Sequence, residues 1–156
     1  LFLFSVFTGI AFVDLKNLSR KHVFTAVDGH QWLRFERWKT KEMSNVRLFE
    51  VPAKLIEKYN DPKRETLFPM LSNQKANEYL KEIAEACGIK KWVTFHVARH
   101  TCATTIALSN GMPMESLDKL LGHKNIRTTQ LYARITDTKL NADMESLEKK
   151  LVGIRL

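Results

Sequence analysis

One segment with the pattern of β-strands, residues 22–52, interrupts a chain whose other apolar residues recur at helical spacing. Within this segment, Asp28 and Gly29 favour a tight hairpin turn, and Pro52 marks the end of the last strand because proline cannot donate a backbone hydrogen bond. The predicted strands are residues 23–27, 31–39 and 46–51. We therefore predict an α+β fold that is mainly α-helical, with a small three-stranded antiparallel sheet.

Helices account for most of the remaining chain. Gly9 and Gly88 stand where helices are expected to stop, and Ser72 is a good N-cap for a long helix. The last predicted helix is amphipathic, with leucine and methionine recurring along one face. The predicted helices lie within residues 1–10, 12–18, 53–59, 73–87, 95–109, 114–121, 125–133 and 136–151.

The composition indicates a basic globular protein. A chain of 156 residues, 44% of them hydrophobic, is long enough for one domain with a sizeable core. Its net charge of +8 favours a polyanionic partner, nucleic acid before an anionic membrane. On charge alone, a basic surface without such a partner is an equally good explanation.

No apolar run approaches the ~20 residues that span a bilayer, so we expect no membrane contact. Cys87 and Cys102 both fall in apolar helical segments, which predicts two reduced, buried thiols in an intracellular protein. The chain starts inside an apolar stretch without an initiator methionine, and we expect it to be a fragment of a longer protein.

A cluster of basic residues stands at the start of the helix predicted within residues 95–109. His96, Arg99 and His100 share one face, because residues three and four apart are neighbours on a helix. Helix starts attract anions, and an arginine there can hold a phosphate through two hydrogen bonds. A zinc site is the alternative, but Val97 replaces the expected glutamate and Arg99 would repel a metal ion. Taken alone, the cluster is better explained as a polar helix start.

Three further residues extend this pattern along the chain. His123 follows Gly122 on a turn at a helix end, Tyr132 comes nine residues later, and Lys39 lies in a predicted hairpin turn. Each is by itself an ordinary turn or surface residue. Together they supply cations, hydrogen-bonding groups and a phenol that could converge on one phosphate.

The order and spacing of these residues resemble the catalytic domain of tyrosine recombinases, also called integrases. The matching motifs are His96-x-x-Arg99-His100, Leu121-Gly122-His123 and Tyr132, together with Thr8-Gly9, Asp14, Lys39-Thr40, Val51-Pro52 and Leu67-Phe68. The resemblance covers nearly the whole chain and is strongest to integrases of Bacteroidetes-type mobile elements such as conjugative transposons. It implies that residues 1–156 have the DNA breaking-rejoining fold and that the family's N-terminal DNA-binding domain lies outside this chain.

The resemblance implies a role for each site residue. Tyr132 would attack a DNA phosphodiester and form a 3′-phosphotyrosyl link, leaving a free 5′-hydroxyl. Arg99 would hold the non-bridging oxygens, and Lys39 would protonate the departing 5′ oxygen. His96 and His123 would bind phosphate and assist proton transfer, whereas His100 and Asp14 would be structural. Because this reaction conserves bond energy, it implies no metal, cofactor or ATP.

The chain departs from the family at one important position. The family usually has a second arginine two residues after Thr8-Gly9, and this chain has Ala11 there. Another basic residue could replace it, with three candidates: Arg20, Arg34 and Arg37. Alternatively, the enzyme works with one arginine at a lower rate, or the position was mutated, or the protein is a degraded relative. We favour compensation or tolerance, because the rest of the motif is present.

The resemblance also implies partners. Double-stranded DNA would be the substrate, four copies would assemble into a synaptic tetramer on it, and accessory DNA-bending proteins could take part. The expected location is the bacterial cytoplasm, with the nucleoid. Two alternatives remain open: a DNA-binding relative with impaired catalysis, motivated by Ala11, and a relaxing activity like that of type IB topoisomerases, with the same chemistry but no synapsis.

Overall fold

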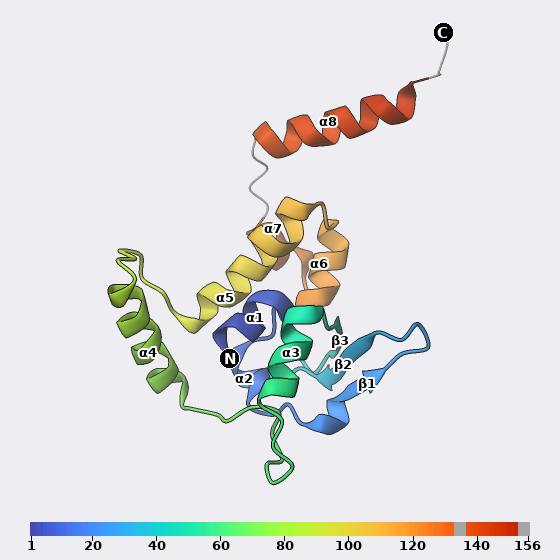
Figure 1. Ribbon diagram of the computed structural model, residues 1–156. Helices are drawn as coiled ribbons and strands as arrows, with labels where there is room; N and C mark the ends of the chain where they lie inside the picture. Colours follow the sequence, from blue (N-terminus) through green and yellow to red (C-terminus); the bar gives the residue numbers. More distant parts are fainter. Residues whose placement is uncertain (133–136, 153–156) are drawn as a thin grey trace.

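The computed structural model describes residues 1–132 and 137–152, and in these the chain forms helices and one small sheet beside them (Figure 1). The N-terminal half contains α1 (Phe2–Thr8), α2 (Phe12–Leu15), a 3-10 turn (Arg20–His22), the sheet and α3 (Glu50–Lys58). The C-terminal half contains α4 (Asn73–Ala86), α5 (Phe95–Thr101), α6 (Met114–Leu121), α7 (Ile126–Gln130) and α8 (Asp137–Leu151). The predicted fold class is confirmed.

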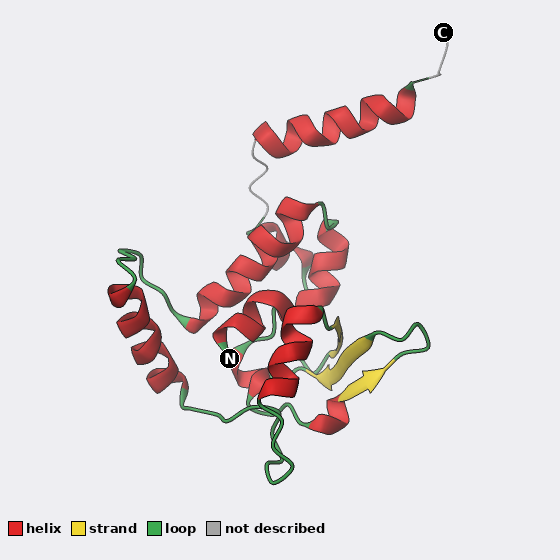
Figure 2. Cartoon of the chain, viewed as in Figure 1, coloured by secondary structure: helices red, strands yellow, loops and turns green. Residues whose placement is uncertain are grey.

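The sheet is the predicted antiparallel meander, with strand order β1-β2-β3. Its strands are β1 (Val23–Thr25), β2 (Gln31–Glu36) and β3 (Met43–Arg47), and they gather on one side of the domain (Figure 2). Leu33 of β2 pairs with Val46 of β3, and both side chains are buried. Residues two apart share one face of a strand, so Leu33 and Phe35 both turn toward the core.

The predicted third strand, residues 46–51, was placed too late in the chain. Strand β2 ends at Glu36, three residues before the predicted end, so the turn and β3 come three residues earlier. The N–H of Arg37 donates to the Glu42 carbonyl at 2.9 Å across this turn, and β3 begins at Met43. Pro52 does not end a strand but lies in the first turn of α3. Proline is tolerated there because the first N–H groups of a helix have no partner within it.

Several helix ends follow the predicted signals. The Ser72 hydroxyl accepts from the Lys75 N–H at 3.1 Å and caps α4. Gly9 and Gly122 end α1 and α6 in the left-handed conformation. The helix predicted within 95–109 is less regular, because α5 continues as a π-helical turn (Cys102–Ala107) and a 3-10 turn (Leu108–Asn110). Thr94 precedes α5 without a side-chain capping bond.

Two apolar clusters form the core. The larger one packs α1 and α2 against the sheet and is centred on side chains such as Phe4, Ile10 and Leu33. The smaller one joins the π-helical turn to α6 and includes Leu117, Leu121 and Tyr132. Leu120 packs against both clusters, so the C-terminal end of α6 lies where they meet.

The two cysteines differ from each other. Cys102 is buried as predicted, and burial raises the pKa of its thiol to about 11, which keeps it protonated and unreactive. The prediction for Cys87 was wrong, since it is exposed at the end of α4. That helix buries only Ala76 and Ala84 among its residues, and it lies beside the rest of the domain (Figure 1). Within the described ranges, no helix has the length and apolar character needed to cross a bilayer.

Gly122 is required both by its backbone conformation and by its neighbour. Its φ is +63°, and a Cβ there would lie 2.5 Å from Nε of Arg37. Gly111 has a similar φ of +83° with no atom within 4 Å of a Cβ, which makes it a matched control.

We predict that Gly111→Ala lowers the free energy of unfolding by about 1 kcal/mol through backbone strain alone. Gly122→Ala should lose a further ~1–3 kcal/mol, because Arg37 must move from its buried position. Urea denaturation of both variants measures the difference. Equal losses would mean that Arg37 does not constrain this position.

Candidate active site

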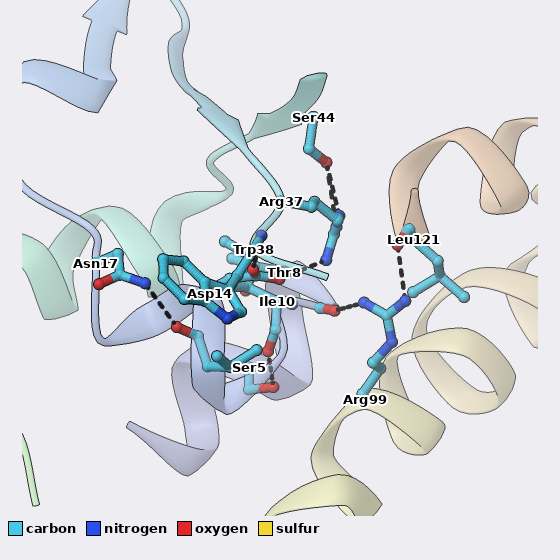
Figure 3. Close-up of polar contacts among 12 residues, drawn as sticks. Ser5, Thr8, Ile10, Asp14, Asn17, Arg37, Trp38, Ser44, Arg99 and Leu121 are labelled. Carbon is cyan, nitrogen blue, oxygen red and sulfur yellow. Dashed lines mark hydrogen bonds and ion pairs between the residues drawn. The ribbon is translucent and has the colours of Figure 1, made fainter. Parts of the chain in front are cut away.

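Arg99 lies at the centre of the site and joins the ends of two helices. It comes from α5, is buried, and donates from Nη1 to the Gly9 carbonyl at 2.6 Å and from Nη2 to the Leu121 carbonyl at 2.7 Å (Figure 3). Carbonyls at the end of a helix have no partner within it, so they accept readily from an outside donor. Because α1 ends at Gly9 and α6 ends at Gly122, the carbonyls of Gly9 and Leu121 are available to accept from Arg99.

Arg37 is a second buried cation in the same region. It donates from Nη2 to the Leu120 carbonyl at 2.8 Å and to the Ser44 hydroxyl at 3.1 Å, and its Nη1 pairs with Asp14 at 3.2 Å (Figure 3). Arg37 and Arg99 therefore bind consecutive carbonyls of α6. Burial and the charge of Arg99 lower the pKa of Arg37 to about 10, and Asp14 acts in the opposite direction. Arg37 is therefore still cationic at neutral pH.

Asp14 holds the turn that carries Arg37. Besides pairing with that arginine, it accepts from the Trp38 N–H at 2.8 Å. Asp14 is only 5% exposed, and each of its two carboxylate oxygens accepts a hydrogen bond from one of these partners. The structural role expected for Asp14 stays a prediction.

His123 follows the end of α6 and contacts Arg99 directly. Its Nε2 lies 2.9 Å from Nη2 of Arg99, and its Nδ1 lies 2.7 Å from the Thr129 hydroxyl. The Thr129 hydroxyl in turn donates to Asp118 of α6. Burial lowers the pKa of His123, as do the nearby charges of Arg99 and Arg37, whereas Asp118 raises it.

Tyr132 lies inside the site rather than away from it. Its ring is packed edge-on against His100, with centroids 4.9 Å apart, and lies parallel to His123 at 6.3 Å. Burial lowers the pKa of Arg99, and a hydrogen bond to the Tyr132 side chain acts in the opposite direction. Phenol, imidazole and guanidinium are thus in mutual contact although they are far apart in the sequence. The structural role expected for His100 stays a prediction.

His96 and Ala11 share a cavity beside Arg99. The cavity has a volume of about 310 Å³ and is lined also by Asn73 and Asn77 of α4. The His96 ring is packed edge-on against His100 at 4.8 Å, and burial together with the charges of His100 and Arg99 lowers its pKa. Because position 11 carries alanine instead of arginine, open space remains next to Arg99.

The three candidates for the missing arginine lie in different places. Arg37 is beside Arg99, as described above. Arg34 points to the other face of β2, where it donates to Asn45 at 3.0 Å and covers the Phe24 ring. Arg20 binds Asn60 at 2.9 Å in a surface loop. Lys39 is exposed in the turn between β2 and β3, two residues beyond Arg37.

Sequence reasoning missed Asp118, Thr129 and Ser44. None has a spacing that marks it as a site residue. One signal was available for Thr129, which lies one helical turn before Tyr132 and would share its face. Asp118 lies one turn before the end of α6, where its side chain can reach the residues that follow Gly122.

A metal site is not formed by the residues that the structure describes, among which no three histidine, cysteine, aspartate or glutamate side chains gather in a suitable group. The zinc alternative for His96 and His100 therefore lacks a third ligand within those residues. Their rings instead pack against each other.

The same fold occurs in solved structures of tyrosine recombinases. The chain matches the XerA recombinase with a TM-score of 0.71 at 25% identity, over 92% of this chain and 54% of that one. It matches the Tn1549 transposon integrase in complex with a circular intermediate DNA with a TM-score of 0.71 at 20% identity, over 93% and 57% of the two chains. For the catalytic domain of bacteriophage HP1 integrase the values are 0.64 and 23%, over 92% and 79%. The fold is that of a tyrosine recombinase catalytic domain.

The sequence model of the Phage integrase family matches residues 1–139, and the chain belongs to this family. Tyrosine recombinase XerD of Listeria monocytogenes serotype 4b (strain F2365) is 43% identical over 70 residues, which cover 45% of this chain and 23% of XerD. Transposase B from transposon Tn554 of Staphylococcus aureus (strain Mu50 / ATCC 700699) is 27% identical over 161 residues, 92% of this chain and 25% of the transposase. The chain spans about a quarter of the length of these relatives.

Proposed function

We propose that this chain is the catalytic domain of a site-specific recombinase that cuts and rejoins double-stranded DNA through Tyr132. The contact of the Tyr132 phenol with Arg99 and His123 carries this proposal, because it unites a nucleophile, a cation and a base in one place. Two relatives are by name a transposase and a transposon integrase, which favours a mobile element as the source. The Bacteroidetes subgroup expected from the sequence stays a prediction.

In the proposed reaction the Tyr132 oxygen attacks the phosphorus of a DNA phosphodiester. A bond forms between that oxygen and phosphorus, and the bond from phosphorus to the 5′ oxygen breaks. The phenol gives its proton to His123, and Lys39 gives a proton to the departing 5′ oxygen. In the reverse direction the 5′-hydroxyl attacks the phosphotyrosine, so the bond energy is kept.

Charge grows on the non-bridging oxygens during this attack, and cations that are already in place stabilise it. Each such cation can stabilise the transition state by about 3–4 kcal/mol. We assign this role to Arg99, with His96 as a further ligand at the edge of the cavity beside it. These donors are held by the protein before DNA binds, so little reorganisation is needed during the reaction.

We predict that the full-length protein forms a covalent complex with a nicked duplex that carries the joined ends of its own DNA element. Tyr132→Phe should abolish the complex, since the phenylalanine ring fills the same space but has no nucleophile. Tyr59→Phe is the matched control, because Tyr59 lies at the end of α3 and has no place in the mechanism. Denaturing gel electrophoresis measures the complex.

The outcome also separates the alternatives. A wild-type protein that binds the duplex but forms no covalent complex would be a DNA-binding relative with impaired catalysis. Covalent complexes with any sequence, accompanied by relaxation of plasmids, would favour the topoisomerase-like activity. A complex that persists in Tyr132→Phe would contradict the assignment of the nucleophile.

We further propose that Arg37 replaces the arginine that is missing at Ala11. Its position beside Arg99 supports this choice over Arg34 and Arg20, whose side chains are engaged elsewhere. A guanidinium is required rather than a simple charge, because only its planar fork can bind α6, Asp14 and a phosphate oxygen together.

We predict that Arg37→Lys slows covalent complex formation by ~100-fold or more, the loss expected for one donor at a developing charge. Arg34→Lys and Arg20→Lys are matched controls and should stay within a factor of two or so of wild type, as exposed substitutions do. In the Arg37→Lys background, Ala11→Arg should recover part of the rate, because the cavity beside Arg99 has room for it. Equal effects of all three lysine variants would contradict the proposal.

Self-association on DNA is the remaining part of the proposed function. Helix α8 lies apart from the rest of the domain (Figure 1) and exposes apolar side chains at helical spacing: Leu140, Met144, Leu147 and Leu151. An apolar stripe of this kind on a helix is stable in water only when another surface covers it. We propose that it packs on a neighbouring copy in the tetramer; accessory DNA-bending proteins stay a prediction.

We predict that Leu147→Glu reduces assembly of the full-length protein on paired DNA sites, while single-site binding is retained. Glu145→Gln, on a different face of the same helix, is the matched control and should assemble normally. Analytical ultracentrifugation of protein–DNA mixtures measures the size of the complexes. Unchanged assembly of Leu147→Glu would show that α8 does not mediate it.

A further inference from the structure

The two ring nitrogens of His123 have different partners, and these partners determine where its proton lies. Nε2 is 2.9 Å from Nη2 of Arg99. A guanidinium has donors only, so Nε2 must accept this hydrogen bond with its lone pair. In a neutral imidazole the other nitrogen, Nδ1, then carries the hydrogen.

The Thr129 hydroxyl receives that hydrogen. It lies 2.7 Å from Nδ1 and donates its own hydrogen to Oδ1 of Asp118, so its oxygen is free to accept from Nδ1–H. Thr129 is fully buried, and its backbone carbonyl accepts from the Tyr132 N–H at 2.9 Å. One threonine therefore links the carboxylate, the imidazole and the residue that carries the phenol.

We propose that Asp118 and Thr129 are positioning residues that keep the proton of neutral His123 on Nδ1, so that Nε2 stays unprotonated. Its lone pair, which accepts from Arg99, then serves as the base for the Tyr132 phenol when Arg99 turns this hydrogen bond to the phosphate. Neither residue touches the reacting atoms. The inference rests on the proposed function, because only a reaction at Tyr132 needs a base in this position. Without Thr129, the Nδ1–H group would lose its acceptor, and only Arg99 at Nε2 would still favour this form of the ring.

The charges around the ring set the direction of its pH response. Arg99 of α5 and Arg37 of the β2–β3 turn disfavour protonation, and Asp118 of α6 favours it; Tyr132 faces the ring from the segment after α7. Burial is the largest effect, and His123 has a pKa below its ordinary value of 6.5. Activity that needs unprotonated Nε2 is therefore complete above pH 6.5 and falls as the pH drops through the lowered pKa of His123.

The first test needs no DNA and is independent of catalysis. In full-length protein with 15N-labelled histidine, NMR identifies which His123 nitrogen bears hydrogen, and His123→Gln provides the assignment. We expect the Nδ1–H form in wild type and in Thr128→Val, the matched control, since Thr128 is the exposed neighbour on α7. Thr129→Val should measurably weaken the preference for Nδ1–H, because Arg99 alone then favours it, and Thr129→Ser should keep it in full.

The second test measures the rate of covalent complex formation against pH. Thr129→Val should be slower by roughly tenfold, the loss expected for one hydrogen bond, with Thr129→Ser close to wild type. Asp118→Asn should move the acidic limb of the profile to lower pH, because it removes the charge that favours protonation of His123. A residue that is merely structural would change the rate and leave this midpoint in place.

The outcomes distinguish this inference from the function on which it rests. Wild-type His123 with hydrogen on Nε2 would overturn the inference, as would a Thr129→Val protein that keeps both the full preference for Nδ1–H and the wild-type midpoint. A wild-type protein that shows Nδ1–H but forms no covalent complex would overturn the proposed function instead. Thermal denaturation of each variant identifies any that fails to fold.

Discussion

The buried guanidinium of Arg99 holds the structure of the site together. Placing a charge in a protein interior is costly unless hydrogen bonds replace the water that it loses. Arg99 meets this need with two backbone carbonyls, Gly9 and Leu121, which lie at the ends of α1 and α6. The same bonds fix these helices relative to α5, so the position of the cation and the packing of the domain depend on each other.

Arg37 is buried in the same region, and its charge adds to the energetic cost of burying Arg99. The charge of Arg99 contributes to the lowered pKa of Arg37, which shows that the two cations repel each other through the interior. Asp14 forms its ion pair with Arg37, and although its charge also stabilises the cationic form of Arg99, one carboxylate does not balance two cations. A site with excess positive charge that is already in place is poorly stabilised when empty and favours an anion such as phosphate. Stability lost in this way is common at functional sites.

Local signals in the sequence were sufficient for much of the fold. Gly9, Gly122, Ser72 and the Asp28-Gly29 turn each act through their own backbone or nearest neighbours, so their effects could be predicted without the tertiary structure. The start of β3 depends instead on where β2 ends and the chain turns back. Cys87 is exposed because α4 buries only Ala76 and Ala84. Such features depend on how elements meet, which local patterns do not contain.

The candidate site could likewise be predicted only in part from the sequence. The motif residues were predicted as a group, and the structure brings Arg99, His123 and Tyr132 into contact. The sequence did not distinguish Arg37 from Arg34 and Arg20. A signal existed, because Arg37 continues the alternation of Leu33 and Phe35 toward the core, whereas Arg34 faces away. Of the partners of His123, only Thr129 had a signal, its spacing from Tyr132. Asp118 had none, since it meets Thr129 only when α6 and α7 pack together.

If Arg37 takes the place of the arginine at position 11, as we propose, the control of the site changes. An arginine at 11 would stand between α1 and α2, independent of the sheet. Arg37 lies instead in the same turn as Lys39, and Asp14 binds this turn at both the Arg37 side chain and the Trp38 N–H. In the proposed mechanism one carboxylate therefore positions a phosphate ligand directly and the proton donor for the leaving group through the backbone. The two cationic functions of the turn are then coupled, so that any shift of the β2–β3 turn would move both relative to Tyr132.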